Sequence, residues 1–431
     1  QRWTRLPPGS TLIRVRADQL RAAMVVGLVR GGRIHSPAVR RAFRAVPRHV
    51  FLPEFSPEDA YRDEPIVTKR DDAGRPISSS SQPAIMGIML DQLDVRPGHR
   101  VLEIGAGTGY NAALMAELVG PTGSVVAVDI DEDLVRGAEE HLMAAGSFSV
   151  RLVTGDGALG YPEGAPFDRI VLTVGSWDIQ PAWWRQLVPG GRLLLPLSVR
   201  GSQLAVALDL VAGPPPGLHS VSVRSCAFVR LRGTGAGPDS SRALGRDGLA
   251  VQTADERPAD PRAVCALLDA PGPEWPSPVR LAAVDLWDGL GLWLAVQQPD
   301  ICRLLVSAAA SDRAPSLLPV GLDGGTVGLL GSHGLALLVP GSRDGAGFDR
   351  RFPVAVRAYG PDGAELAARL AGQLDTWAAA GRPTATDLRL RAYPAGVAPA
   401  ASSAAVVRKA HSQLVLDWPR NSVPSSPILE R

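Results

Sequence analysis

The stretch Val101-Leu-Glu-Ile-Gly-Ala-Gly-Thr-Gly-Tyr110 decides the fold of this chain, together with Val125-Val-Ala-Val-Asp-Ile130 shortly after it. A short apolar run, three alternate glycines and a helix-like continuation over 111–118 predict a strand, a tight turn and a helix. The second apolar run ends in a carboxylate, Asp129. This order predicts a nucleoside-binding crevice at the carboxyl ends of two parallel strands, where an acid accepts hydrogen bonds from both ribose hydroxyls.

The spacing of the glycines distinguishes between nucleoside cofactors. Gly105, Gly107 and Gly109 are one residue closer together than the Gly-x-Gly-x-x-Gly of dinucleotide sites. An acid, Glu103, precedes them, and its carboxylate repels a pyrophosphate but helps to hold a cationic amino-acid group. S-adenosylmethionine has no phosphate, carries an ammonium and a sulfonium, and keeps the ribose diol. The loop therefore favours S-adenosylmethionine over NAD, with an ordinary glycine-rich turn as the alternative.

Composition narrows the class of protein. The chain has 431 residues, of which 45% are hydrophobic and 20% charged, and this balance predicts two or three globular domains. A net charge of +2 without a dense basic stripe gives no reason to expect a nucleic-acid partner. No apolar run has membrane-spanning length, so we expect a soluble, cytoplasmic protein. The three cysteines lie far apart without metal-ligand spacing, and no metal is expected: Cys226, Cys265 and Cys302.

The N-terminal region predicts helices followed by a loop. Residues 18–52 read as two helices, with Asp18 as a candidate cap of the first and Ser36-Pro37 as the start of the second. Residues 61–81 are polar and punctuated by glycine and proline, which predicts a loop. A helix is expected over Pro83–Leu93.

Strands and helices are expected to alternate from residue 100 to 197. Such alternation predicts an α/β, doubly wound, Rossmann-like sheet that is mostly parallel. A closing pair of antiparallel strands is expected at Leu204–Val211 and Ser225–Leu231. The expected sheet strands lie near 100–104, 124–129, 150–154, 168–173 and 192–195.

The C-terminal half predicts a second, smaller domain. We divide the chain into residues 1–235, a glycine-rich linker at 236–247, an α+β domain at 248–417 and a mobile tail at 418–431. One clear helix is expected over 363–380. Strand-like runs occur at 281–285, 291–296, 303–306, 334–339 and 353–358.

Ordered matches over about 200 residues resemble the protein-L-isoaspartate O-methyltransferase family. They cover residues about 18–235 and are far more specific than the glycine loop alone. The resemblance implies a class I methyltransferase sheet and S-adenosylmethionine as cofactor. The matching stretches are Val46-Pro-Arg48, Ser81-Gln-Pro83, Val101–Tyr110, Val125–Asp129, Gly155-Asp-Gly157, Gly160-Tyr161, Phe167-Asp168, Leu187–Pro196 and Phe228–Leu231.

The same resemblance implies roles for individual residues. The serine before Gln-Pro, Ser81, resembles the active-site serine, and Asp156-Gly157 resembles the adenine-facing turn. Beside Glu103, the glycines and Asp129, the cofactor contacts implied are Ala106 and Ile130. The substrate contacts implied are Ser80, Gln82, Ile66 and Val67.

The chemistry of the implied acceptor makes the serine intelligible. A carboxylate with an ordinary pKa near 4 is ionised at pH 7 and needs no general base. The enzyme mainly aligns one oxygen with the methyl carbon and excludes water. A neutral hydroxyl at Ser81 can hold the other oxygen without quenching the nucleophile. The alternative is that Ser78–Ser81 is a polar loop that caps the following helix.

Three departures from the family pattern concern segments that face the substrate. Residues 66–77 are longer and more charged than the short Gly/Gln-rich loop of the repair enzymes, and 174–181 replaces an Ala-Ala-Pro-like segment. Ala84-Ile85 stand where the family often has an aromatic residue or histidine. The catalytic core is therefore expected to be kept while acceptor recognition is changed.

The additional C-terminal chain suggests a particular acceptor. Extended members of this family are similar to methyltransferases that accompany ribosomally made peptides, notably lanthipeptides. The resemblance implies methylation of a peptide aspartate, followed by succinimide formation and isoaspartate, with residues 248–417 helping to present the peptide. The alternatives are a repair enzyme that acts on isoaspartate in damaged proteins, and a non-catalytic scaffold that binds the cofactor. The oligomeric state is left open.

Overall fold

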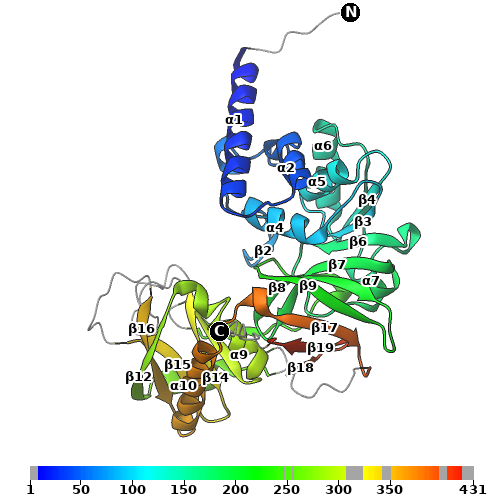
Figure 1. Ribbon diagram of the computed structural model, residues 1–431. Helices are drawn as coiled ribbons and strands as arrows, with labels where there is room; N and C mark the ends of the chain where they lie inside the picture. Colours follow the sequence, from blue (N-terminus) through cyan, green and yellow to red (C-terminus); the bar gives the residue numbers. More distant parts are fainter. Residues whose placement is uncertain are drawn as a thin grey trace, which may run out of the picture.

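The computed structural model describes residues 8–245, 248–254, 257–306, 324–341, 351–397 and 405–419, with side chains from residue 15 onward. Figure 1 shows two bodies built on separate sheets, with a long N-terminal helix standing at one end. One sheet has ten strands, the other has seven, and a two-stranded hairpin lies apart from both. The expected class, a Rossmann-like sheet with a smaller C-terminal α+β unit, is confirmed.

Helices precede the main sheet, as expected. Ser36 caps the second helix, since its hydroxyl accepts hydrogen bonds from the amides of Ala38 and Val39. Asp18 was wrongly expected to cap the first helix, which begins ten residues earlier and places Asp18 in its interior. The helices are α1 (Pro8–Arg30), α2 (Pro37–Ala45) and the short α3 (Pro57–Ala60).

The expected loop at 61–81 is instead an antiparallel hairpin. β1 (Ile66–Arg70) pairs with β2 (Pro76–Ser80), and both strands carry β-branched residues that fit a pleated surface. The turn is held by Asp71, whose carboxylate accepts hydrogen bonds from the amides of Ala73 and Arg75. Most charged residues of the hairpin lie at or beside its turn. The strands that flank the turn are only a few residues long, so the sequence resembles a polar loop.

The main sheet is doubly wound around its first strand. The order β5-β4-β3-β6-β7 is parallel throughout, and the chain crosses from β5 to β6 on the other side of β3. This reversal places a crevice at the carboxyl ends of β3 and β4. All five expected strands are confirmed: β3 (Arg100–Ile104), β4 (Ser124–Asp129), β5 (Val150–Thr154), β6 (Phe167–Leu172) and β7 (Leu187–Val199).

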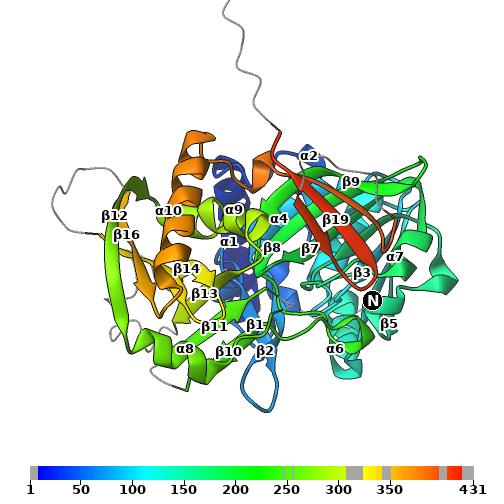
Figure 2. The same ribbon diagram turned by 90° about the horizontal axis from the view of Figure 1, so that it is seen from below.

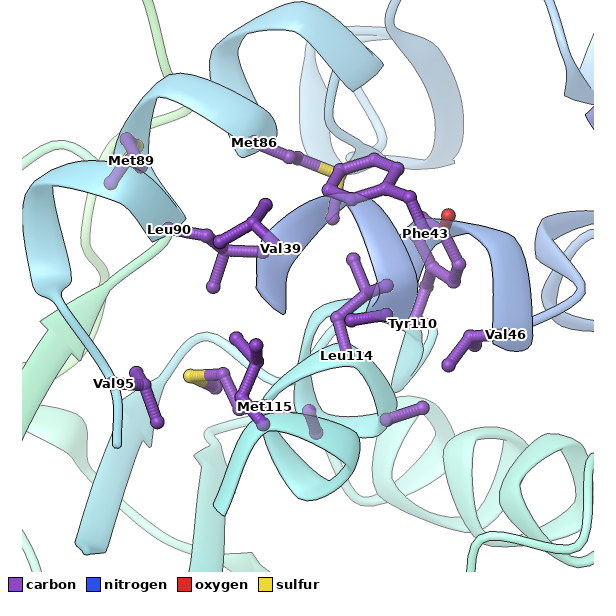
Figure 3. Packing of buried hydrophobic residues seen from close by; sticks show 14 of the residues in the cluster. Val39, Phe43, Val46, Met86, Met89, Leu90, Val95, Tyr110, Leu114 and Met115 are labelled. Atoms are coloured by element: carbon purple, nitrogen blue, oxygen red, sulfur yellow. The ribbon is translucent and has the colours of Figure 1, made fainter. Parts of the chain in front are cut away.

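Helices bury both faces of this sheet. Figure 3 shows α2 and α4 packed on the helix that follows the glycine loop, with Phe43, Met86 and Tyr110 meeting at their contact. The opposite face packs Trp183 among strand residues of the sheet. The helices of this region are α4 (Pro83–Leu93), α5 (Tyr110–Val119), α6 (Glu132–Ala144) and α7 (Pro181–Arg185).

The antiparallel side of the sheet differs from the expectation. After β8 (Ser202–Val211), the next strand is β9 (Gly217–Ser225), so the expected strand at Ser225–Leu231 lies too late in the chain. Residues 226–232 instead leave the sheet and return over the crevice, where Leu231 and Val229 hydrogen-bond Gly175.

The last strands of the chain belong to the main sheet and not to the second body. Figures 1 and 2 show β17 and β19 beside β9, and the sheet order continues β9-β17-β19-β18. Sequence analysis placed these residues in one domain with 248–388, and the strand pairing contradicts that assignment. The strands are β17 (Arg389–Pro394), β18 (Ala405–Arg408) and β19 (Ser412–Asp417).

The seven-stranded antiparallel sheet forms the second body. Helix α10 (Gly363–Ala379) covers one face, as expected. The apolar run 291–296, expected as a strand, is instead helix α9 (Leu290–Gln297). The prediction was wrong because a short apolar run lacks the periodicity that distinguishes a helix from a strand. The expected strand at 281–285 is only the end of β12 and a short 3₁₀ turn.

The remaining elements of the second body are the strands of this sheet and one more helix. That helix is α8 (Pro261–Leu268). The strand order is β10-β11-β13-β14-β15-β16-β12. Their bounds are β10 (Ser241–Ala243), β11 (Leu249–Thr253), β12 (Pro271–Leu281), β13 (Ile301–Val306), β14 (Gly325–Leu330), β15 (Leu335–Pro340) and β16 (Phe352–Tyr359).

Three further observations concern expectations from composition. None of the helices in the described ranges is both long and apolar enough to cross a membrane. Within the same residues, no three histidine, cysteine or carboxylate side chains gather as a metal site. At the expected tail, Trp418 stacks on Trp293 with ring centroids 5.7 Å apart, and residues 420–431 lie outside the described residues.

Candidate functional site

A cavity opens at the carboxyl ends of β3 and β4 and contains about 970 Å³ of space not filled by atoms. Its walls come from the glycine loop, the end of β2, helix α4 and residues 228–232. Most of the residues expected at the site line it: Ser80, Ser81, Glu103, Gly105, Ala106, Gly107, Asp129, Ile130 and Gly157. Four expected site residues are not among its lining residues: Ile66, Val67, Gln82 and Asp156.

The glycine loop needs its glycines for close packing as well as for turning. Gly105 has a φ of +99°, and a Cβ there would lie 2.9 Å from the Thr173 hydroxyl oxygen. Gly109 has a φ of +84°, and its Cβ would lie 3.2 Å from that of Ala138. Side chains at either position would be strained and would push β6 or α6 away. The loop backbone therefore stays open to the cavity.

Glu103 is fully buried at the floor of the cavity with one oxygen left over. Its Oε1 accepts a hydrogen bond of 2.7 Å from the Asn111 amide. Among the described residues, no group hydrogen-bonds to Oε2. Burial raises the pKa of this carboxyl to about 8; the bond from Asn111 lowers it and the charge of Asp129 raises it. An unpaired carboxylate oxygen in a dry cavity is the complement of a cationic ligand group.

Asp129 lies at the neighbouring strand end with its carboxylate partly engaged. One oxygen accepts a hydrogen bond of 2.9 Å from the Gly107 amide and the other accepts one of 3.2 Å from the Asp131 amide. Burial raises the pKa of Asp129, and these two amides oppose that shift. A carboxylate has about four acceptor positions, so it can still accept bonds from a diol.

An ion-pair cluster closes this end of the cavity. Lys69 of the hairpin pairs with Asp131 at 3.1 Å and with Asp133 at 2.8 Å. Arg232 of the returning segment donates to both oxygens of Asp131, at 3.1 and 2.6 Å. The bond from Arg232 is the main cause of the lowered pKa of Asp131. The hairpin and the returning segment are thus tied to the same acid, two residues beyond Asp129.

The serines line the cavity at the end of β2 and in the loop that leads into α4. The Ser78 hydroxyl accepts a hydrogen bond of 3.0 Å from Thr68, so it is engaged within the hairpin. No described group hydrogen-bonds to the Ser81 hydroxyl, which is half-buried in the cavity wall. The alternative, that Ser81 caps α4 with its side chain, finds no support, since Gln82 is the N-cap residue.

The remaining predicted residues lie behind the cavity wall. Ile66 pairs with Ser80, and Val67 pairs with Ser79, so both hold the serine strand. Gln82 donates a hydrogen bond to the Asp63 carbonyl at 2.9 Å. Asp156 accepts hydrogen bonds from the Thr234 amide and hydroxyl, both at 2.7 Å, which leaves Gly157 as the member of that turn in the cavity.

Sequence analysis missed three residues that support the site. Asn111 orients Glu103, Trp183 donates a hydrogen bond of 2.9 Å to the Gly157 carbonyl, and Arg48 bonds the Ser81 carbonyl at 2.9 Å. Asn111 had a local signal, since Asn111 and Glu117 are polar residues in a helix that is otherwise largely apolar. Arg48 had a signal only as part of the matching stretch Val46-Pro-Arg48, which gave it no role, and Trp183 had none, because its partner lies 26 residues away.

The cavity fits S-adenosylmethionine on its own chemistry. The free oxygen of buried Glu103 suits an ammonium, Asp129 suits a ribose diol, and the open glycine backbone gives room for both.

Comparisons with known proteins agree with this geometry. The family model described as Protein-L-isoaspartate(D-aspartate) O-methyltransferase matches residues 19–234. The chain is 41% identical to the protein-L-isoaspartate O-methyltransferase of Methanopyrus kandleri over 47% of this chain and 86% of that protein. It is 38% identical to that of Hyperthermus butylicus over 50% and 89%. A solved structure with the same description aligns at a TM-score of 0.48 and 24% identity, over 86% of this chain and 96% of that one.

Proposed function

The chain belongs to the protein-L-isoaspartate O-methyltransferase family, and on that premise we propose that it methylates the side-chain carboxylate of an aspartyl or isoaspartyl residue in a peptide. Its cofactor is S-adenosylmethionine. The observation that carries the proposal is the arrangement of one cavity. The carboxyl groups of Glu103 and Asp129 line the same cavity as the free hydroxyl of Ser81.

The residues at the serine end suit an acceptor that needs no base. When bound, S-adenosylmethionine supplies an electrophilic methyl group on its sulfonium. The Ser81 hydroxyl donates a hydrogen bond to one acceptor oxygen and leaves the other free to attack. Met86, Met89 and Leu90 make the adjoining wall apolar, which excludes water from the reacting oxygen.

Replacing Ser81 with Ala is expected to lower kcat about 10- to 100-fold, because the acceptor carboxylate loses the donor that aligns it. The affinity for S-adenosylhomocysteine should change less than threefold, since the Ser81 hydroxyl makes no hydrogen bond to Glu103 or Asp129 among the described residues. Steady-state methyl transfer and calorimetric binding measure the two effects. Ser149→Ala, an exposed serine beyond α6, is the control. Unchanged kcat, or a parallel loss of cofactor binding, contradicts the role.

Two acceptors are consistent with this reaction. The tailoring of a ribosomally made peptide, such as a lanthipeptide, is favoured by the chain beyond residue 234 and by the charged hairpin β1–β2. There, the methyl ester of an aspartate is attacked by the next backbone nitrogen. Methanol leaves, and hydrolysis of the succinimide gives isoaspartate. Repair of isoaspartate in damaged proteins is favoured by the names of the relatives. A cytoplasmic location and the absence of a nucleic-acid partner stay predictions.

Matched peptides with Asp or isoAsp at one position, linear and cyclised, distinguish these acceptors. Tailoring predicts methyl incorporation and succinimide on the constrained Asp peptide, measured by mass. Rapid labelling of generic isoAsp peptides with none of the constrained Asp peptide would favour repair. If no peptide gains a methyl group while S-adenosylhomocysteine still binds, the chain is a cofactor-binding scaffold.

A further inference from the structure

Arg48 is a buried cation that no ion pair neutralises. Its side chain has 0% exposure. Within the described residues, no carboxylate lies within ion-pair distance of its guanidinium; the charge of nearby Asp63 acts on it from further away, and the Asp63 carboxylate accepts a hydrogen bond from the Ala84 amide. Burying a guanidinium costs free energy unless other groups compensate for the lost water. The contacts of Arg48 therefore indicate its role.

Those contacts are aimed at the wall of the cavity. The guanidinium donates hydrogen bonds to the carbonyls of Ala60 at 2.8 Å and Ser81 at 2.9 Å, with a longer one of 3.5 Å to Ser80. It also lies 3.6 Å from the sulfur of Met86 and 5.1 Å from the centre of the Tyr110 ring. Four of the five groups line the cavity: Ser80, Ser81, Met86 and Tyr110.

The position of Arg48 places a positive charge behind the serine part of the cavity wall. The two acidic residues that line the cavity, Glu103 and Asp129, come from β3 and β4, where a bound ammonium would keep Glu103 ionised. Arg48 lies directly behind the serines. The charge of Asp63 acts on it from beyond ion-pair distance, so an anion in front of Ser81 would add to a compensation that the protein leaves partial. Carbonyls occupy its Nε and Nη2 donors and the Met86 sulfur contacts Nη1, so the guanidinium attracts a carboxylate mainly through its charge. Direct bonding would tie up the oxygen that must attack.

The same contacts fix the backbone that carries Ser81. Arg48 comes from the 3₁₀ turn after α2, and Figure 3 shows the neighbouring Phe43, Met86 and Tyr110 packed together at this place. One planar guanidinium joins this turn, the start of α4 and the start of α5. A lysine would supply the charge but only a single point of attachment.

We propose that Arg48 is a positioning residue of the acceptor site, which holds the Ser80–Ser81 backbone and supplies the positive potential that attracts the acceptor carboxylate. The proposal rests on the function proposed above. It concerns the acceptor end of the cavity only, so binding of the cofactor is expected to be independent of it.

Three variants of the full chain, and a fourth for chemical rescue, test it. The three are Arg48→Met, Arg48→Lys and the control Arg44→Met, which removes an exposed cation from α2, and Arg48→Ala serves for the rescue. Arg48→Met should lower kcat/KM for a carboxylate peptide about 100-fold, and Arg48→Lys about 10-fold, because charge is kept but the planar attachment is lost. The affinity for S-adenosylhomocysteine should stay within threefold in all three. In Arg48→Ala, added methylguanidinium should restore part of kcat, whereas ammonium should not.

Several outcomes would overturn the proposal. One is a kcat/KM for the peptide within threefold of wild type in Arg48→Met. Another is equal loss in Arg48→Met and Arg48→Lys together with parallel loss of S-adenosylhomocysteine binding, which indicates a merely structural role. If Arg48→Met fails to fold, Arg48→Lys alone tests the proposal. An unchanged kcat/KM in Arg48→Lys would show that the planar guanidinium is not needed to hold the Ser80–Ser81 backbone. Failure of the proposed function is distinct, because wild-type protein would then transfer no methyl group.

Discussion

Replacing Glu103 with Gln is expected to weaken binding of S-adenosylhomocysteine about 100-fold above pH 8, because a buried ammonium loses its charged partner. Glutamine keeps the shape and the bond to Asn111, so the loss reports the charge. S-adenosylhomocysteine is a suitable probe because it carries the ammonium without the sulfonium. Isothermal calorimetry measures the dissociation constant.

The pH dependence of this binding provides a second readout. The pKa of Glu103 is raised to about 8 by burial, so the cofactor-free protein holds a proton there at lower pH. That proton must leave before a cation binds, and the affinity of wild type should fall as the pH drops below about 8, approaching tenfold per pH unit. The Glu103→Gln variant should lack this dependence.

The folding stability of the cofactor-free protein should change with pH in the direction opposite to its cofactor affinity. The carboxyl has a raised pKa in the folded protein, against 4.5 for an unperturbed glutamate. The folded state therefore binds more protons between these values, and cofactor-free wild type should lose stability as the pH rises from about 4.5 to 8. Glu103→Gln should then melt higher than wild type above pH 8.

An exposed glutamate on the same region of the fold, Glu117 of α5, is the matched control. Glu117→Gln should leave both the affinity and the melting temperature unchanged within error. Equal affinity of wild type and Glu103→Gln at every pH would show that the carboxylate does not bind the ligand.

Replacing Asp178 with Ala is expected to lower the melting temperature by roughly 3–5 °C, because about 3 kcal/mol of buried hydrogen bonding is lost. Asp178 has 0% exposure and accepts three hydrogen bonds. They come from the Ile179 amide at 2.7 Å, the His411 amide at 2.6 Å and the Ser412 hydroxyl at 2.5 Å. Alanine leaves these three donors without their partner, and the Ser412 hydroxyl among them is buried.

The bonds of Asp178 also join distant parts of the chain. They tie the loop after β6 to the turn before β19, while Gly175 of the same loop is bonded to the segment that lines the cavity. Asp178→Ala should therefore expose the β18–β19 strands to limited proteolysis before the rest of the protein. Asp72→Ala, in the exposed hairpin turn, is the control, and melting equal to that control would contradict the role assigned to Asp178.

Elements with strong local patterns were predicted correctly. The five parallel strands each carry an apolar run between turn residues, and helix α4 carries proline at its first position. The hairpin β1–β2 was missed because its strands have five residues each around a charged turn. Helix α9 was mistaken for a strand because it is apolar on all sides, which erases the periodicity of a helix.

Local sequence patterns were enough to identify the carboxyl groups of the cofactor site. Glu103 and Asp129 end two consecutive parallel strands, and the carboxyl ends of neighbouring parallel strands must meet at one edge of the sheet. Only the tertiary structure decided the acceptor end. The Ser81 carbonyl accepts a hydrogen bond from Arg48, which belongs to a different helical segment. After the second body, the chain returns to the main sheet, where β17, β19 and β18 continue it beyond β9. Such contacts depend on how whole elements pack, and no local spacing of residues encodes them.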